Sequence, residues 1–317
     1  MIQISGEVIN RKLDFPTLVA SLCADHRTGM DCQQDMLLRQ PNPTDDENYL
    51  LVRAAWKRND VLGIKMATIF PDNKNRQQPL PAVQAIYALF DAENGTPRAI
   101  IDGDTLTYWK TAADSALGSS ILARKDCKKL LMIGAGAMAP WLIKAHLAVR
   151  PGIEHITIWN RNPARADQLA ISLDLPGKHI HATSNLDNAV GICDLICSAT
   201  MSQNPIIKGA LLSPGCHVDL VGAFTPTMRE ADDECMQRSR LFVDSRLTTI
   251  DEIGELMIPL AKGIISENDI QADLYDLCQG ARKGRQNDQE ITLFKNGGGG
   301  HLDLMTARFI YDCCKEC

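Results

Sequence analysis

The sequence of 317 residues contains no long apolar segment, since no run of about 18 apolar residues occurs in it. A membrane-spanning helix is therefore not expected. The N-terminal residues, MIQISGEVINRKLDF, also lack the apolar core and small-residue cleavage site of a secretory signal. These two absences predict a cytoplasmic protein without a membrane partner.

Blocks of like charge are missing as well. The formal net charge of −6 is spread along the chain, and neither a Lys/Arg-rich segment nor an acidic tail occurs. A nucleic-acid partner is therefore not expected. Apolar residues make up 45% and charged residues 23% of the chain, which is ordinary for globular proteins, and the length favours two domains.

The sequence also lacks a recognisable set of metal ligands. Its cysteines number eleven, an odd count, and several lie in apolar runs, so we expect reduced thiols that serve packing. Cys193 and Cys197 would lie about 13 Å apart on one strand, too far to share a metal or a disulfide. Cys314 and Cys317 have C-x-x-C spacing, but no second ligand cluster completes a zinc site, and a mobile end is the favoured interpretation. No metal is expected.

From about Lys128 onward, strand and helix patterns alternate regularly. The apolar runs are KKLLMI, HITIW, CDLICSA, CHVDLVG and RLFVDS, and helical stretches such as PWLIKAHLAV separate them. This alternation predicts parallel βαβ units with strands buried on both faces. We therefore expect an α/β fold with a doubly wound Rossmann domain over residues 117–293.

The first third of the chain has a different pattern. Asn94-Gly95 and Asp102-Gly103 flank the short apolar run PRAII, which predicts hairpins in an antiparallel or mixed sheet. Residues 1–116 are thus expected to form a second, mixed α+β domain.

The end of the chain belongs with this second domain. After a glycine run, residues 294–317 regain helix periodicity, so a C-terminal helix is expected to pack on the N-terminal domain. His301 and Asp303 are expected to start and cap this helix, with a contact to the cofactor as the alternative.

A glycine-rich turn follows the first strand of the Rossmann pattern. Gly134, Gly136 and Ala139 form G-x-G-x-x-A between LLMI and a helix expected to start near Ala137. Gly134 allows a tight turn, Gly136 lets the backbone approach a pyrophosphate, and the helix N-terminus with Ala137 and Met138 directs N–H groups at that anion. The turn predicts a nicotinamide dinucleotide site, the alternative being a plain strand-to-helix turn.

The second Rossmann strand ends in WNRNP, where an NAD-selective site would place an acidic residue to hold the ribose 2′-OH. Asn160 stands there instead. Neutral Asn160 does not repel a 2′-phosphate, and Arg161 can pair with one. NADPH is therefore the predicted cofactor and NADH the weaker alternative. The competing interpretation is that Arg161 is solvated and that selectivity lies elsewhere.

Two further loops follow apolar strands of the same sheet. Ser198, Ala199 and Thr200 come after CDLIC, and Val221 and Gly222 come after CHVDL. Ligands of such sheets bind outside the carboxyl ends of the strands, so these residues are predicted to contact the cofactor. Thr200 fits an ordinary helix cap equally well, and both interpretations stay open.

Several motifs, taken in order and spacing, resemble the ornithine cyclodeaminase and mu-crystallin family. They are GIKMATIFP, LTYWKTAADSALGS, MIGAGAM, SAT, VGAFTPTMREADDE and TLFKNGGGG, which together span nearly the whole chain. The resemblance implies an N-terminal substrate-binding and dimerisation domain, a Rossmann domain, and a homodimer.

The resemblance also implies that basic residues of the N-terminal domain hold a substrate carboxylate. They map onto Arg39, Lys65 and Lys110. Much of the family has arginine at the position of Lys110, so a point charge replaces a bidentate contact. From the residues alone, Lys110 is expected to lead a helix whose N-terminus acts on the same anion. For each base the alternative is a solvated surface charge.

Phe224 departs from the family pattern, because cyclodeaminases of this family carry an aspartate there that acts on the amine and water. Phenylalanine cannot do acid or base chemistry. Together with Asn160 it argues against cyclodeamination, and the sequence is most similar to the ketimine reductases of the family.

The predicted reaction is NADPH-dependent reduction of Δ1-pyrroline-2-carboxylate to L-proline, with Δ1-piperideine-2-carboxylate and L-pipecolate as a second pair. Phe224 would pack on the ring, and Lys65 or Thr225 would relay a proton. Two enzymatic alternatives stay open, an ornithine cyclodeaminase and an oxidoreductase like alanine dehydrogenase. A third alternative is a non-catalytic NADP-binding protein like mu-crystallin.

Overall fold

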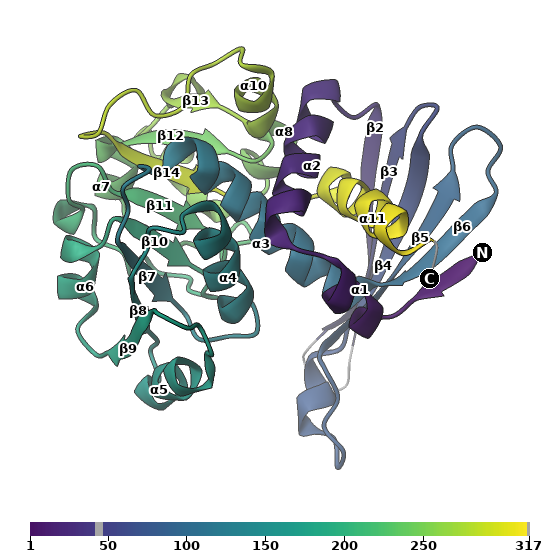
Figure 1. The fold of residues 1–317 in the computed structure, drawn as a ribbon, viewed down its shortest axis with the longest axis horizontal. Helices are drawn as coiled ribbons and strands as arrows, with labels where there is room; N and C mark the ends of the chain where they lie inside the picture. The colour runs from purple at the N-terminus through teal and green to yellow at the C-terminus, as the bar shows by residue number, and fades with distance from the viewer. Residues whose placement is uncertain (42–46, 316–317) are drawn as a thin grey trace. The chain divides into compact units, whose positions relative to one another are not determined.

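The computed structural model describes residues 1–41 and 47–315 (Figure 1). The chain forms two compact units, one of Met1–Lys110 with Gly299–Cys317 and one of Thr111–Gly298. These boundaries differ from the predicted ones, 116 and 294, by a few residues on each side. The strand over residues 291–295 pairs within the sheet of the second unit, which draws the tail boundary past residue 294.

The second unit is a Rossmann domain built on a parallel sheet. Its strand order is β13-β12-β14-β11-β10-β7-β8-β9, and all its pairings are parallel. The strands are β7 (Lys129–Ile133), β8 (His155–Trp159), β9 (His179–Thr183), β10 (Leu195–Ser198), β11 (His217–Leu220), β12 (Ser239–Val243), β13 (Ile270–Ala272) and β14 (Ile291–Lys295). The order reverses between β7 and β10, and ligands of such sheets bind at this switch point. The predicted doubly wound fold is confirmed.

The helices of this unit connect consecutive strands. They are α4 (Ala139–Val149), α5 (Pro163–Ser172), α6 (Leu186–Ile192), α7 (Asp233–Arg238), α8 (Arg246–Thr249), α9 (Gly254–Ala261) and α10 (Leu274–Gln279). Every residue of β10 and β11 is buried. Strands covered on both faces favour continuous apolar runs, and this explains the runs CDLICSA and CHVDLVG.

The first unit contains a six-stranded mixed sheet in the order β1-β6-β5-β4-β3-β2. Its strands are β1 (Ile2–Ile4), β2 (Cys32–Pro41), β3 (Glu47–Lys57), β4 (Val61–Ile69), β5 (Val83–Asp91) and β6 (Pro97–Asp102). Only β1 and β6 pair in parallel among the described strands of this sheet. The Asn94-Gly95 turn joins β5 to β6 as predicted, with Gly95 in the left-handed region at φ 75°.

Asp102-Gly103 does not form the second predicted hairpin turn. It begins the long helix α3 (Gly103–Leu122), and Asp102 Oδ1 accepts a hydrogen bond from the backbone N of Thr105 at 2.8 Å. A Cβ at Gly103 would lie 2.6 Å from the backbone of Ala85, so glycine permits this close approach to β5. The same dipeptide suits a helix start here, because aspartate is a good N-terminal cap.

Helices α1 (Gly6–Lys12), α2 (Phe15–Thr28) and α11 (Gly300–Cys314) belong to the first unit, and Figure 1 shows α2 and α11 beside its sheet. Asp25 of α2 binds Arg308 of α11 at 2.8 Å and Lys57 of β3 at 3.0 Å. The expected return of the C-terminal helix to the N-terminal domain is thereby confirmed.

The other face of this sheet is apolar and exposed. Along β4 buried and more accessible residues alternate, and the apolar side chains of Met36, Val52, Met66 and Ile86 lie in one cross-strand row of the accessible face. Met36 is 49%, Met66 36% and Ile86 45% exposed. Exposed apolar rows of this kind are uncommon on the surface of monomeric proteins.

The cysteines of the described residues are all free thiols. The sequence suggested that Cys193 and Cys197 share one strand. In the structure Cys193 is the C-cap of α6, and only Cys197 lies in β10. Cys317 and the expected mobile end at that position lie outside the described residues. Within residues 1–41 and 47–315, no helix combines the length and apolar character needed to cross a membrane.

Candidate active site

The turn after β7 has the geometry of a phosphate-binding turn. Gly134 has φ 103°, and its backbone N donates a hydrogen bond to Trp159 O at 2.8 Å. A Cβ at Gly134 would lie 2.6 Å from Ala199 O, whereas a Cβ at Gly136 would meet no heavy atom within 4 Å. Glycine is thus required at the first position by conformation and packing, and the second position leaves open space for a ligand.

The helix that follows begins at Ala139, slightly later than predicted. Ala137 therefore lies in the turn, and Met138 is the N-cap, whose side chain makes no capping hydrogen bond. Backbone N–H groups at a helix start favour a bound anion.

A cavity of about 300 Å³ opens at the carboxyl ends of β7, β8 and β10. It brings together residues that the sequence placed at the cofactor, namely Gly134, Gly136, Asn160, Arg161, Ala199 and Thr200. Arg165 lines it too, and also lines a neighbouring cavity with Gly136 and Ala137. The sequence interpretation missed Arg165, although a second arginine in the first turn of the helix after WNRNP could have indicated it.

The side-chain amide of Asn160 forms hydrogen bonds on two sides of this cavity. Its Oδ1 accepts from the backbone N of Ala135 at 3.2 Å, and its Nδ2 donates to Asn162 O at 2.9 Å. Asn162 in turn caps α5 by accepting from Ala164 N at 3.1 Å. Asn160 therefore joins the glycine turn to the start of α5, and the positive charge beside it comes from Arg161 and Arg165.

These residues fit a dinucleotide coenzyme. The turn leaves space at Gly136, two arginines supply positive charge, and a neutral amide stands where a carboxylate would repel a second phosphate. A nicotinamide coenzyme, when bound, supplies or accepts a hydride.

The end of β10 and the loop after it form hydrogen bonds with a buried carboxylate. Ser198 is fully buried and its hydroxyl donates to Glu230 at 2.6 Å. Thr200 Oγ1 also donates to Glu230, at 2.7 Å, so Thr200 is not the helix cap that the sequence allowed. Glu230 was missed, because Ser198 and Thr200 lie 32 and 30 residues before it and no local spacing reveals such contacts.

The basic residues predicted for the substrate come together in the first unit. Lys110 Nζ lies 3.0 Å and Lys65 Nζ 3.4 Å from the same oxygen, Asp303 Oδ1. Lys65 also donates to Thr107 Oγ1 at 2.7 Å. Asp303 was expected as a helix cap, but it lies buried in the first turn of α11 and joins both lysines.

Burial and neighbouring charges shift the pKa values of this cluster. Burial lowers the pKa of Lys65 to about 8, although the Asp303 carboxylate partly opposes the shift. Burial would raise the pKa of Asp303, but the ammonium groups of Lys110 and Lys65 outweigh it and hold that pKa at about 2. The Asp303 carboxylate therefore stays ionised at neutral pH.

The sequence suggested that Lys110 lies at a helix N-terminus, and the structure shows that it does not. Helix α3 begins at Gly103, so Lys110 lies two turns inside it. Its ammonium group pairs with the Asp303 carboxylate, and no helix N-terminus adds its positive end to that of Lys110.

Arg39 does not share a cross-strand row with Lys65. It lies exposed on β2 opposite Tyr49, whereas Arg53 of β3 lies directly opposite Lys65 and binds Asp35 Oδ2 at 2.9 Å. Positions four apart on a strand are separated by about 13 Å. The sequence interpretation missed Arg53, and the signal available was an arginine inside the apolar run LLVRAAW.

Phe224 and Thr225 lie in the loop after β11, in the Rossmann unit. Phe224 is 59% exposed, which is unusual for a large aromatic side chain. Thr225 O accepts from Gly254 N at 2.9 Å, which ties this loop to the start of α9. Val221 N, just before it, donates to Ser198 O at 2.8 Å.

A buried polar cluster lies deeper in the same unit. His146, Cys197 and Asp219 place possible metal-ligand atoms within 4.8 Å of one another. Asp219 accepts hydrogen bonds from His146 Nε2, Cys197 Sγ and Ser115 Oγ, each at 3.1 Å. These contacts account for the cluster as a hydrogen-bonded network that the sequence did not reveal.

Comparison with known protein families gives a match over most of the chain. Residues 25–317 match the model of the ornithine cyclodeaminase/mu-crystallin family.

Two curated relatives and one solved structure are similar along nearly their whole length. A Δ1-pyrroline-2-carboxylate reductase of Paracoccus denitrificans is 45% identical over 94% of this chain and 92% of its own. The protein SAR DEFICIENT 4 of Arabidopsis thaliana is 39% identical, with 94% of each chain covered. The structure of Thermococcus litoralis Δ1-pyrroline-2-carboxylate reductase, in complex with NADH and L-proline, superposes with a TM-score of 0.90 at 28% identity, covering 100% of this chain and 98% of that one.

Proposed function

Because the chain belongs to the ornithine cyclodeaminase/mu-crystallin family and is an NAD(P)-dependent oxidoreductase, we propose that it reduces Δ1-pyrroline-2-carboxylate to L-proline. The observation that carries the proposal is Phe224, an exposed apolar side chain where cyclodeaminases have a catalytic aspartate. The curated relative from Paracoccus denitrificans and the structure from Thermococcus litoralis, both reductases of this imine, support the same reaction.

The charge of the lysine cluster suits a substrate with one carboxylate. Lys65, Lys110 and Arg53 carry three positive charges, and Asp303 and Asp35 carry two negative ones, which leaves one net positive charge. Asp303 Oδ2 is buried without a hydrogen-bond partner among the described residues, and it suits an N–H donor of the substrate. A cyclic imine with an adjacent carboxylate provides the anion, and its ring nitrogen provides the N–H donor once it has taken up a proton.

Reduction of the C=N bond needs a hydride on carbon and a proton on nitrogen. We assign the proton to Lys65, whose pKa of about 8 leaves it protonated at neutral pH yet able to release a proton. Thr225 is the second candidate for this relay. Lys110 is assigned to the carboxylate, with Arg53 opposite Lys65 as the second cation in place of the exposed Arg39, and Phe224 is assigned to the apolar side of the ring.

We propose NADPH as the preferred coenzyme and NADH as the weaker one. The support is the pair Arg161 and Arg165 beside neutral Asn160 in one cavity. The Thermococcus litoralis structure contains NADH, so relatives of this fold also use the coenzyme without the 2′-phosphate. The ratio of the dissociation constants of NADPH and NADH tests the preference.

The proposal extends to three further properties. The six-membered Δ1-piperideine-2-carboxylate is a second substrate, because the exposed side chain of Phe224 does not restrict the size of the substrate ring. The apolar face of the six-stranded sheet binds a second copy of this chain. A cytoplasmic location agrees with the free thiols of the described cysteines, since oxidising compartments favour disulfides.

The deciding experiment measures coenzyme oxidation by the purified protein with each cyclic imine. We expect turnover of Δ1-pyrroline-2-carboxylate with NADPH and formation of L-proline. The matched reaction, ornithine with NAD⁺, is expected to give neither proline nor ammonia. Release of ammonia from ornithine would identify a cyclodeaminase, oxidation of alanine would identify an amino-acid dehydrogenase, and coenzyme binding without any turnover would favour a binding protein.

A further inference from the structure

Glu230 is a fully buried carboxylate in the segment between β11 and α7. Its Oε1 accepts three hydrogen bonds from the end of β10 and the loop that follows. They come from Ser198 Oγ at 2.6 Å, Thr200 N at 2.8 Å and Thr200 Oγ1 at 2.7 Å. One oxygen thus fixes both the end of β10 and the loop that lines the coenzyme cavity.

The other oxygen of Glu230 holds the neighbouring loop. Oε2 accepts from Gly222 N at 2.7 Å and from Ala223 N at 3.3 Å, directly before Phe224. The two loops touch, because a Cβ at Gly222 would lie 2.0 Å from Thr200 O. The loop after β10 also touches the phosphate-binding turn, at Ala199 and Gly134. A shift of Thr200 would therefore move the turn and the Phe224 loop together.

The backbone of Glu230 is itself held in place. Glu255 of α9, also buried, accepts from Glu230 N at 2.7 Å and from Ala231 N at 3.0 Å. The buried ammonium of Lys295 provides the nearby positive charge, and it donates to Leu220 O at the end of β11 at 2.9 Å. Such a satisfied buried network is rigid, as a positioning device must be.

We propose that Glu230 is a positioning residue for hydride transfer. It holds the loops after β10 and β11 at a fixed separation, and so sets the place of the coenzyme relative to Phe224. Glu230 acts through Thr200, Gly222 and Ala223. The proposal requires that the chain is a coenzyme-dependent oxidoreductase, but it does not depend on which imine is reduced.

The test is Glu230→Gln, which keeps the size of the side chain. A carboxylate accepts at both oxygens, whereas the amide NH₂ would face either the N–H groups of Gly222 and Ala223 or the donors of Ser198 and Thr200. One loop then loses its anchor. We expect kcat at saturating substrate to fall roughly ten- to hundred-fold, because small displacements of reacting groups have effects of this size. The primary isotope effect with deuterated reduced coenzyme should increase.

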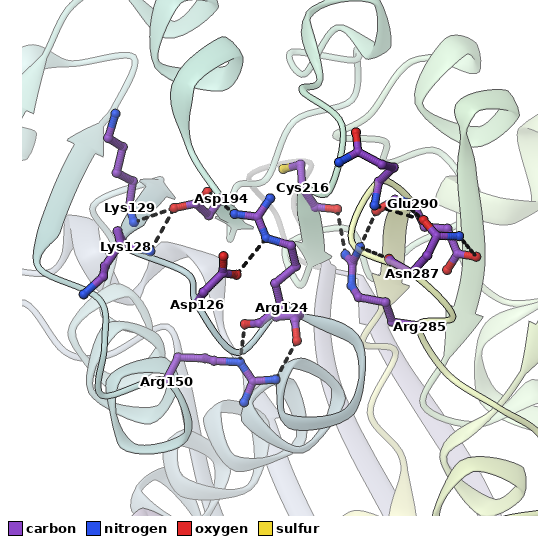
Figure 2. A network of polar contacts seen from close by, with 12 residues as sticks. Arg124, Asp126, Lys128, Lys129, Arg150, Asp194, Cys216, Arg285, Asn287 and Glu290 are labelled. Atoms are coloured by element: carbon purple, nitrogen blue, oxygen red, sulfur yellow. Dashed lines mark hydrogen bonds and ion pairs between the residues drawn. The ribbon is translucent and has the colours of Figure 1, made fainter.

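Asp194→Asn is the matched control. Asp194 is likewise a carboxylate that accepts backbone hydrogen bonds, from Lys128 N at 2.8 Å and Lys129 N at 3.0 Å, but at the amino ends of the strands (Figure 2). We expect this variant to lower the melting temperature while kcat and the isotope effect stay as in the wild type. Equal losses of kcat in both variants, or a folded Glu230→Gln with wild-type kcat and isotope effect, would overturn the proposal.

Ser198→Ala keeps the proposal testable if Glu230→Gln does not fold. Ser198 is fully buried and acts through Glu230, so its loss should change kcat and the isotope effect in the same direction by a smaller factor. Unchanged values in Ser198→Ala would then count against the proposal. Should the wild type turn over neither imine, the proposed function fails by itself. Coenzyme dissociation constants, read from tryptophan fluorescence, would still test Glu230, and we expect weaker binding in Ser198→Ala and Glu230→Gln but not in Asp194→Asn.

Discussion

Lys65 lies at the centre of the charged cluster in the first unit. It is buried on β4, opposite Arg53 and Tyr87 in neighbouring strands, and its ammonium reaches Asp303 and Thr107. Burial disfavours its charged form and brings its pKa to about 8. A lysine in this range can give up a proton during turnover, which an exposed lysine does poorly.

This pKa predicts how the reductase activity depends on pH. If protonated Lys65 supplies the proton, kcat/KM for imine reduction should fall as pH rises through about 8, because the lowered pKa makes the ammonium lose its proton there. The measurement is a pH profile of kcat/KM. In Lys65→Arg the guanidinium stays charged, so the descending limb should disappear even if the rate is lower. A limb unchanged in that variant would assign it to another group or to the substrate.

At this scale the sequence predicted some functional residues and missed others for a physical reason. Gly134 and Gly136 follow from the spacing within one turn, and Asn160 and Arg161 follow from their place at the end of the next strand; the cavity brings all four together. The contact of Lys110 with Asp303 joins residues almost two hundred positions apart, and periodicity carries no information on such pairs. Glu230 was missed for the same reason.

Among the elements, α3 differs most from its prediction. The parallel strands were predictable because burial on both faces imposes uninterrupted apolar runs. The start of α3 was not, because Asp-Gly suits both a hairpin turn and a helix start, and the contact of Gly103 with Ala85 decides between them. The expected helix start at Lys110 was wrong as a consequence.

The C-terminal end of α3 is held by two arginines. Arg150 Nη2 donates to the carbonyl oxygens of Ser119 at 2.7 Å, Ser120 at 3.0 Å and Ala123 at 2.7 Å, and Arg285 Nε donates to Leu122 O at 2.6 Å. Ser120 and Leu122 lie in the last turn of α3, where a helix leaves its carbonyl groups without backbone partners. A positive charge at this end also interacts favourably with the helix dipole.

Arg150→Met should therefore destabilise the Rossmann unit. Buried carbonyl groups would lose their donors, and we expect the free energy of unfolding to fall by about 3 kcal/mol. Urea denaturation followed by circular dichroism measures it. The control is Lys128→Met, which removes an exposed ion pair with Glu154 and should leave the free energy of unfolding nearly unchanged. Similar losses in the two variants would contradict the helix-end role of Arg150.

On the scale of the whole molecule, the six-stranded sheet has two unlike faces. One face packs against α11 and carries Lys65, whereas the other presents the row of Met36, Val52, Met66 and Ile86 to solvent. The alternation along each strand predicts that the sheet has two different faces, but not which face a helix covers. The exposed apolar row and the buried Lys65 thus lie on opposite faces of one sheet.

Met66→Lys should separate the proposed dimer. It places a charge in the middle of the apolar row, where association would bury it without a partner, at a cost of several kcal/mol. Sedimentation velocity should show a dimer for the wild type and a monomer for the variant. Leu247→Lys is the control, because Leu247 is 81% exposed in the Rossmann unit, and it should remain dimeric. A wild type that is monomeric at micromolar concentration, or a Met66→Lys variant that stays dimeric, would place the apolar row outside any interface between copies of this chain.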